Sequence, residues 1–420
     1  MTEARILTSR ATVLERIADA FRRRDPYYDF RWPPLDARRK KLNNRLADLL
    51  KQGHPMECAL QHLYEAKWLI NYTDDWTSAE AALDACEKSV QEVNQPRVVQ
   101  ADDGSWGPCC REWYRKLEPT IDALQEREAA TDPLKPLAFI SVLQKPETLT
   151  RLLQAVSVSD IVATGRNCRD EQNALLTAFG QLIFKDGLRK LLVCRVKDLK
   201  FEISKDLEKA FEDHVWGLQH KDTGYWGPSY KLDDELITVP DLSYTFHIVH
   251  YYMDGTNRVA PGLKEMVATT LAIKDGIYPN GWYNKGKVST DHNNYDVVTL
   301  FDCGWKAAPE YQDQMRKEIQ ELVTWCLTTS LQYDQFGTDR TIDAYYYGVR
   351  FLDRVGFWDK AKRFWRDDDI PLPPGCPSPE TIRQRLLLGF KFVDDGSEYC
   401  ETVTQILTGW TPPPDACGRT

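Results

Sequence analysis

The chain has 420 residues and a formal net charge of -9 at pH 7, with 42% hydrophobic and 28% charged residues, a composition typical of folded proteins. The negative balance argues against general binding of nucleic acid or anionic membranes, because both require a basic face. No run approaches the roughly 18–20 apolar residues that cross a bilayer, and the first ten residues lack the apolar stretch of a secretory signal. We therefore expect no nucleic acid and no membrane partner, and a cytoplasmic protein, or a secreted one if a leader has been removed.

Helical periodicity of the apolar residues predicts helices along most of the chain. The expected helices cover residues 12–24, 55–70, a segment that begins at 78, 113–127, 145–156, 170–193, 206–216, 242–253, 262–274, 294–301, 311–329, 341–355 and 379–390. Turn sequences rich in Gly, Pro and Asn separate them, and no alternating run is long enough for a major sheet.

These elements predict an all-α fold, in which helical hairpins close into an (α/α) toroid around a central cleft. We expect a single domain over residues 1–420, with residues 1–35 as an N-terminal helical extension. An open helical-repeat solenoid is the alternative. The 11 cysteines form no Cys-x-x-Cys pair, so we expect reduced, mostly buried thiols.

Two turns share the sequence Gly-x-Trp-Gly-Pro, at residues 104–108 and 224–228. Gly allows the positive φ of a tight turn, Pro fixes the exit of the chain, and Trp covers the neighbouring helix ends. One interpretation is a structural connector between hairpins. The other is that Trp106, Tyr225 and Trp226 stack on a ring-shaped substrate at the mouth of a cleft.

The polar stretch before the apolar helix 174–184 contains Arg166, Asn167 and Arg169. Unpaired N–H groups at a helix start favour an anion, and two guanidinium groups and an amide add a carboxylate grip. The alternative is that Asn167 caps the helix and Arg169 pairs with a neighbouring acid.

The helix expected at 242–253 places Tyr244, His247 and Tyr251 on one face, with His250 at its edge. The stretch lacks the Glu of the zinc motif His-Glu-x-x-His, so we expect no metal. A core histidine and an acid–base or carboxylate-contacting histidine both remain open for His247.

Two further polar stretches open apolar helices. His292 and Tyr295 lie within one turn of each other, although Thr290 or Asp291 would serve there as a simple cap. Arg340 precedes a run of three tyrosines, most of which we expect in the core. The sequence has no dinucleotide, nucleotide-phosphate or nucleophile-elbow motif, so we expect no cofactor.

Two groups of toroid proteins resemble these features. The terpene cyclases and protein prenyltransferases carry a Gln-x-x-x-Gly-x-Trp repeat. We expect the two turns to match only its Gly-x-Trp part, and the Asp-x-Asp-Asp acid of the cyclases is absent. The second group is the (α/α)-toroid polysaccharide lyases, whose Asn/His/Tyr sites are similar to the combination of Asn167, His247, His292 and Tyr295. Polysaccharide lyase family 38, which degrades alginate or glucuronan, is the nearest in character.

The lyase resemblance implies metal-independent β-elimination on a uronic-acid polysaccharide. Asn167 with Arg166 or Arg169 would neutralise the substrate carboxylate, which eases removal of the C5 proton. His247 would be the base or a second carboxylate contact, and Tyr295 the base or the acid, with His292 assisting. A tyrosine base needs cations to lower its usual pKa of about 10, so an alkaline optimum would follow.

The residues assigned to substrate binding are Trp106, Arg169, Tyr225, Trp226, Tyr244, Tyr251 and Arg340. The expected partner is an acidic polysaccharide, which predicts a cleft locally richer in basic residues than the whole chain. A cyclase or transferase acting on an isoprenoid is the alternative enzyme, and a helical interaction scaffold is the alternative without catalysis. The oligomeric state stays open.

Overall fold

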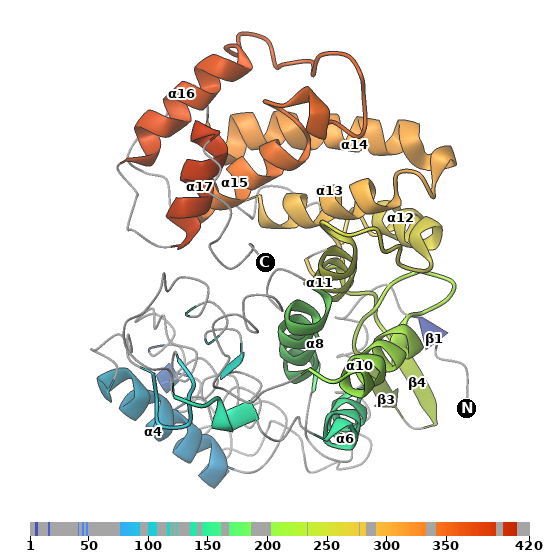
Figure 1. The fold of residues 1–420 in the computed structure, drawn as a ribbon, viewed down its shortest axis with the longest axis vertical. Helices are drawn as coiled ribbons and strands as arrows, with labels where there is room; N and C mark the ends of the chain where they lie inside the picture. The colour runs from blue at the N-terminus through green and yellow to red at the C-terminus, as the bar shows by residue number, and fades with distance from the viewer. Residues whose placement is uncertain are drawn as a thin grey trace, which may run out of the picture. The chain divides into compact units, whose positions relative to one another are not determined.

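The computed structural model of the chain comprises two compact units. The described residues are 76–92, 100–106, 135–140, 145–160, 168–185, 203–232, 234–276, 278–282, 291–332, 342–391 and 398–409, with isolated positions between 5 and 48 and between 116 and 123. Figure 1 draws these elements as a ribbon.

Unit 1 comprises residues 1–218 and 228–239. Its helices are α4 (Trp76–Glu92), α6 (Pro146–Val156), α8 (Arg169–Phe184) and α10 (Lys205–Leu218). α6 packs on α8 and α10, and Phe184 and Phe211 meet in their core with ring centroids 5.3 Å apart. Burial of these aromatic rings stabilises the unit.

A small sheet completes unit 1, with the strand order β1-β4-β3-β2. The strands are β1 (Arg5–Ile6), β2 (Val158–Ser159), β3 (Ser229–Leu232) and β4 (Glu235–Thr238). β3 and β4 form an antiparallel hairpin with Ser229 opposite Thr238, while β1 and β2 pair in parallel with β4 and β3. Strands this short show no alternation in the sequence, which is why we did not expect them.

Unit 2 comprises residues 219–227 and 240–420. Its helices are α11 (Leu242–Met253), α12 (Leu263–Ala272), α13 (His292–Gly304), α14 (Gln312–Trp325), α15 (Ile342–Arg354), α16 (Pro379–Phe390) and α17 (Glu398–Thr408). A π-helical turn, Cys326–Ser330, extends α14.

The helices of unit 2 pack in an alternating order. α11 packs on α13, α13 on α15 and α15 on α17, whereas α12 and α14 pack on α13, and α16 packs on α17 (Figure 1). Arg354 at the end of α15 forms ion pairs with Asp254 and Asp302, which lie at the ends of α11 and α13. The carboxyl ends of these three helices therefore meet.

The all-α prediction is confirmed: eleven α-helices and only short strands occur among the described residues. None of the helices described is both long enough and apolar enough to cross a membrane. Of the described cysteines, four are buried and two are half-buried. The single-domain prediction stays a prediction, and most of residues 1–35 lies outside the described residues.

Candidate functional site

The residues predicted to carry chemistry divide into three groups. Arg166, Asn167 and Arg340 lie outside the described residues. Trp106 and Arg169 belong to unit 1. The remaining ones belong to unit 2, where α11, α13 and α15 bring several of them together.

On α11, His247 is half-buried and its Nδ1 lies 3.0 Å from the hydroxyl of Tyr251. Tyr251 is buried, with 6% of its surface exposed. Tyr244, predicted on the same face, is 1% exposed and belongs to the core. The helical spacing thus holds for His247 and Tyr251, whose ring and hydroxyl form a hydrogen-bonded pair.

Arg350 of α15 joins two tyrosines on different helices. Its guanidinium donates to the Tyr295 hydroxyl of α13 and to the Tyr346 hydroxyl one turn earlier, each at 2.6 Å. Its central carbon also lies 4.2 Å from the centroid of the Tyr295 ring, a cation–π distance. Tyr295 further touches Phe246 of α11, with centroids 5.7 Å apart, so one tyrosine connects all three helices.

The expectation that nearby cations bring the pKa of Tyr295 below its usual value is wrong. Burial raises its pKa, because only 6% of the residue is exposed and a phenolate there would lose its hydration. Arg350 and Arg354 oppose this rise without overcoming it. Tyr295 is therefore a neutral phenol that can donate a proton, and it is unsuited to act as the base.

The next residue of α13 after Tyr295 is a buried carboxyl group, Asp296. Asp296 is 1% exposed, and its Oδ2 accepts a hydrogen bond of 3.1 Å from the Tyr278 hydroxyl. Its Oδ1 is buried and has no hydrogen-bond partner among the described residues. Burial raises the pKa of Asp296 well above its usual range, and the bond from Tyr278 and the charge of Arg350 only partly oppose this. Burial therefore favours the protonated form of the Asp296 carboxyl group.

Aromatic rings surround this carboxyl group. The Tyr278 ring lies 5.3 Å from His292, and His292 lies 4.6 Å from Tyr347 of α15, measured between ring centroids. His292 and Tyr347 are half-buried, so this side of the cluster retains access to solvent. We call Tyr278, His292, Tyr295, Asp296, Tyr347 and Arg350 the α13–α15 cluster.

Asp291, at the start of α13, is a separate buried carboxyl group. It is fully buried, and its Oδ1 accepts a hydrogen bond of 2.6 Å from the side chain of Asn294. Burial raises its pKa to about 6, against the hydrogen bonds from Ser330, Asn294 and Cys326. Its side chain does not cap the helix, contrary to the simplest interpretation of this stretch.

The aromatic residues of the two Gly-x-Trp-Gly-Pro turns are buried. Trp106 is 3% exposed, and Tyr225 and Trp226 are 1% exposed each. The Tyr225 hydroxyl lies 2.9 Å from Thr270 Oγ1 in the core of unit 2. A side chain without an exposed face cannot stack on a sugar, so the structure favours the interpretation of these turns as connectors over that of sugar stacking.

The two turns nevertheless share more than their sequence. The Trp106 N–H donates to Thr120 Oγ1 at 3.0 Å, and the Trp226 N–H donates to Thr245 Oγ1 at 3.1 Å. Gly104 and Gly224 both have positive φ, and a Cβ at either would clash with a backbone carbonyl oxygen. The same local structure therefore occurs once in each unit.

A glutamine side chain binds each of the two turns. The expectation that only Gly-x-Trp of the Gln-x-x-x-Gly-x-Trp repeat is present is wrong for the turn at residues 104–108. Gln100 stands four residues before Gly104, which gives the full Gln-x-x-x-Gly-x-Trp spacing. Its amide donates to the carbonyls of Gly104 and Lys135, each at 2.8 Å. Gln219 stands five residues before Gly224 and donates to its carbonyl at 3.0 Å and to that of Pro261 at 2.8 Å. Each glutamine thus ties its turn to a later segment.

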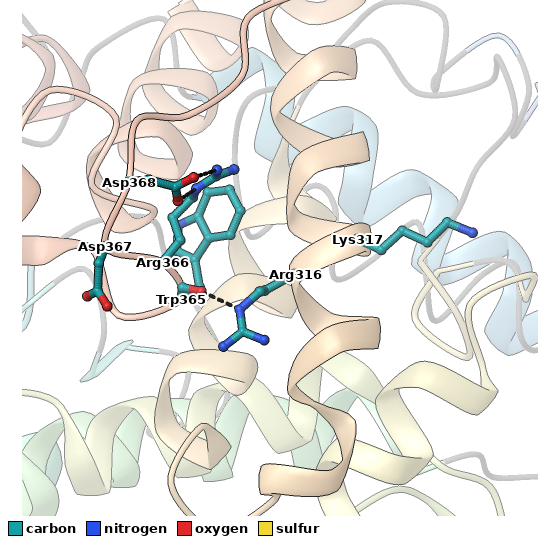
Figure 2. A pocket seen from close by; sticks show the side chains of 6 residues that line it. All are labelled: Arg316, Lys317, Trp365, Arg366, Asp367 and Asp368. Carbon is teal, nitrogen blue, oxygen red and sulfur yellow. Dashed lines mark hydrogen bonds and ion pairs between the residues drawn. The ribbon is translucent and has the colours of Figure 1, made fainter.

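A pocket with a volume of about 590 Å³ lies on unit 2, and none of the predicted site residues lines it (Figure 2). It is lined by Arg316, Lys317, Trp365, Arg366, Asp367 and Asp368. Arg316 donates to Asp313 at 2.6 Å, and Arg366 forms two hydrogen bonds with Asp368 at 2.7 and 2.6 Å. Trp365 is only 1% exposed. The two arginines of the pocket, Arg316 and Arg366, are thus already paired with carboxylates.

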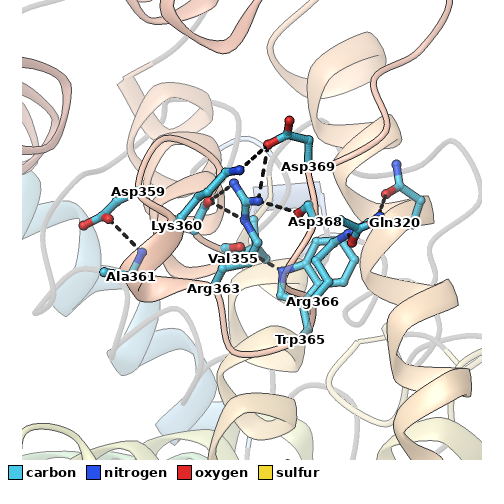
Figure 3. Close-up of polar contacts among 11 residues, drawn as sticks. Gln320, Val355, Asp359, Lys360, Ala361, Arg363, Trp365, Arg366, Asp368 and Asp369 are labelled. Carbon is cyan, nitrogen blue, oxygen red and sulfur yellow. Dashed lines mark hydrogen bonds and ion pairs between the residues drawn. The ribbon is translucent and has the colours of Figure 1, made fainter.

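The loop beside this pocket is held by its own polar contacts (Figure 3). Arg363 donates to the Gly356 carbonyl through two nitrogens and to the Asp368 carbonyl at 2.7 Å, and Lys360 pairs with Asp369 at 2.8 Å. The Trp365 indole donates to the Val355 carbonyl at 2.8 Å. These contacts stabilise the loop and supply no reactive group.

Comparison with known proteins finds no matching family model, no matching curated protein and no matching solved structure. Within the described ranges, no group of three or more His, Cys, Asp or Glu side chains could hold a metal ion.

Proposed function

We propose that the chain is an isoprenoid cyclase of the (α/α)-toroid type, which starts its reaction by transferring a proton from Asp296 to a carbon–carbon double bond. The observation that carries this proposal is the pair of glutamine-completed turns, which extends the resemblance to the cyclase repeat from three residues to the whole of it in the first turn. The alternating packing of α11 to α17 is compatible with hairpins that close into a toroid.

A turn sequence shared with a family does not determine a reaction, which depends on the side chains at the site. The Asp-x-Asp-Asp acid of the cyclases is absent, and another carboxylic acid must supply the proton. Asp296 fits this role because burial favours its protonated form and the Tyr278 hydroxyl donates to Oδ2, which leaves Oδ1 to carry the proton. An acid without an acceptor for its proton is poised to give that proton to a substrate.

The proton would form a new C–H bond at one alkene carbon, while the π electrons leave a cation on the other carbon. Attack of further double bonds on that cation closes the rings, and transfer of a proton from carbon to water ends the reaction. The faces of Tyr278, Tyr295 and Tyr347 would stabilise the cation, since an aromatic ring attracts positive charge at its face. Asp296 would regain its proton from water.

The test uses Asp296→Asn together with Asp353→Asn, a half-exposed surface carboxylate paired with Lys362 at 2.7 Å. The proteins are incubated with squalene and with geranylgeranyl diphosphate, and cyclic products are identified by mass spectrometry. We expect Asp353→Asn to retain the activity and Asp296→Asn to lose it by about 10²- to 10⁴-fold, the usual contribution of a general acid. Equal activity of both variants would contradict the role of Asp296.

A polysaccharide lyase is the second candidate, and the Arg350–Tyr295 and His247–Tyr251 pairs favour it. Arg350 would neutralise the uronate carboxylate, His247 would remove the C5 proton, and the neutral Tyr295 would protonate the leaving oxygen. The same proteins are therefore assayed on alginate and glucuronan by the ultraviolet absorbance of the unsaturated product. A cyclase rate falls as pH rises and its acid ionises, whereas proton abstraction by a base speeds up with pH.

A further inference from the structure

The environment of Arg350 differs from that of its neighbour Arg354, one turn later on α15. Arg354 is balanced by two carboxylates, Asp254 at 2.9 Å and Asp302 at 2.8 Å. Arg350 donates instead to the two phenols of Tyr295 and Tyr346. No carboxylate of the described residues lies within ion-pair distance of it. Two cations on one helix thus have different roles, since only Arg354 has its charge neutralised within this part of the chain.

The phenols hold Arg350 in place without neutralising it. Burial keeps Tyr295 a neutral phenol, whereas a guanidinium keeps its charge in proteins, so Arg350 is a cation held by uncharged partners. Asp296 is close enough for its charge to interact with that of Arg350, but burial favours the protonated, uncharged form of its carboxyl group. A largely buried cation is normally paired, because removing it from water is costly.

The donors around Arg350 suit an oxyanion. A guanidinium has five N–H groups, and the two phenols engage only two of them. The Tyr295 oxygen accepts from Arg350, so its own O–H can donate to a ligand on the same side. Several donors around one positive charge match the oxygens of a phosphate or a carboxylate.

From this geometry we propose that Arg350, framed by Tyr295 and Tyr346, binds an oxyanion of the substrate, and that in the cyclase this group is the diphosphate of an isoprenoid diphosphate. The inference rests on the proposed function for the identity of that group. The anion would also offset the positive field that opposes protonation of Asp296, so binding at Arg350 favours the acid form of the proton donor. Binding of the diphosphate at Arg350 of α15 and protonation of Asp296 of α13 therefore favour each other.

The experiment measures binding of inorganic pyrophosphate by isothermal titration calorimetry to the full chain and to Arg350→Gln, Arg350→Lys and Arg316→Gln. We expect Arg350→Gln to weaken binding by about 10- to 100-fold, the effect of a charge-assisted hydrogen-bond pair, and Arg350→Lys to weaken it less. Arg316→Gln removes the same charge from the surface pocket and should bind like the unchanged chain. Circular dichroism checks that each variant is folded.

Should Arg350→Gln disturb folding, Tyr346→Phe provides the second variant, since it keeps the cation and removes one hydroxyl that orients it; we expect a loss of a few-fold. Unchanged pyrophosphate binding in a folded Arg350→Gln would overturn the proposal, as would loss of binding only in Arg316→Gln, which would move the anion to the surface pocket. Binding of a uronate oligosaccharide but not of pyrophosphate would overturn the diphosphate assignment.

These results are separable from a failure of the proposed function, because binding is measured without turnover. Asp296→Asn that binds pyrophosphate but forms no product supports both proposals. Cyclisation of uncharged squalene without any pyrophosphate binding supports the cyclase and contradicts the role of Arg350.

Discussion

At the scale of single residues, Asp296 lowers the stability of the fold while it serves the proposed reaction. Its folded pKa is raised above the unfolded value of about 3.9, so the folded state holds the proton after the unfolded state has released it. Stability is then lost as pH rises from about 4 towards the folded pKa, because the folded state binds more protons in that window. Below about pH 4 both states are protonated and the effect vanishes.

We therefore expect Asp296→Asn to be more stable than the unchanged chain near pH 7, by roughly 0.5–2 kcal/mol, a usual gain when a strained functional site is relieved. The gain should shrink towards zero near pH 4. Chemical denaturation at several pH values measures it, with Asp353→Asn, which removes a surface carboxylate, as the control. A variant that is less stable at every pH would show that the Asp296 carboxyl is structural.

At the scale of elements, the two glutamine-completed turns provide a matched pair. Gln100 is 7% exposed and makes three hydrogen bonds, since its Oε1 also accepts from the Lys135 N–H at 2.6 Å. Gln219 makes two hydrogen bonds, and the one to the Pro261 carbonyl is exposed to solvent. Each lost hydrogen bond costs about 0.5–1.5 kcal/mol, and a buried carbonyl left without a donor adds to this.

We expect Gln100→Ala to lower the free energy of unfolding by about 2–4 kcal/mol and Gln219→Ala to lower it by about 1–2 kcal/mol, as measured by urea denaturation. Gln100→Ala has the larger effect because it removes more hydrogen bonds and these are better buried. Gln219→Glu should be worse than Gln219→Ala, since it sets a carboxylate against two carbonyl oxygens. Gln384→Ala, which removes an exposed contact with Glu380 on α16, is the control. Equal effects at all three positions would mean that the turns depend on their Gly and Trp alone.

Helices with a regular apolar period and clear ends could be predicted from the sequence. α11 and α16 occupy the expected residues 242–253 and 379–390, and Asp241 and Ser378 cap them through their side chains. α13 is longer than the expected 294–301, because polar residues at its start are helical but carry no apolar pattern. α17 was missed although Cys400, Val403 and Leu407 are buried at helical spacing.

The site was predicted only in part. His247, His292 and Tyr295 were expected from their spacing, and the structure places His292 and Tyr295 in one cluster with α15. Asp296 was missed because a single acid inside an apolar run looks like any helix residue until its burial is known. Tyr278 was missed because it lies in a turn, and its contact with Asp296 spans 18 residues that no local pattern connects.

At the scale of the whole molecule, the net charge of -9 separates the two candidate functions. A polyuronate carries a negative charge on every sugar and is repelled by an acidic protein, whereas an isoprenoid diphosphate brings one anionic group and a long apolar chain. The pocket lined by Arg316, Lys317 and Arg366 also contains two aspartates, so it offers little excess charge to a polymer.

We expect the protein to pass through an immobilised alginate column without retention at about pH 7.5 and low salt, where repulsion is least screened. A basic protein such as lysozyme, loaded on the same column, serves as the retained control. The Arg350→Gln variant should elute at the same position, because one buried cation does not alter the field that a polymer meets. Retention that disappears as salt is raised, and that Arg350→Gln weakens, would instead indicate a basic groove around α15. That result would favour the lyase over the cyclase.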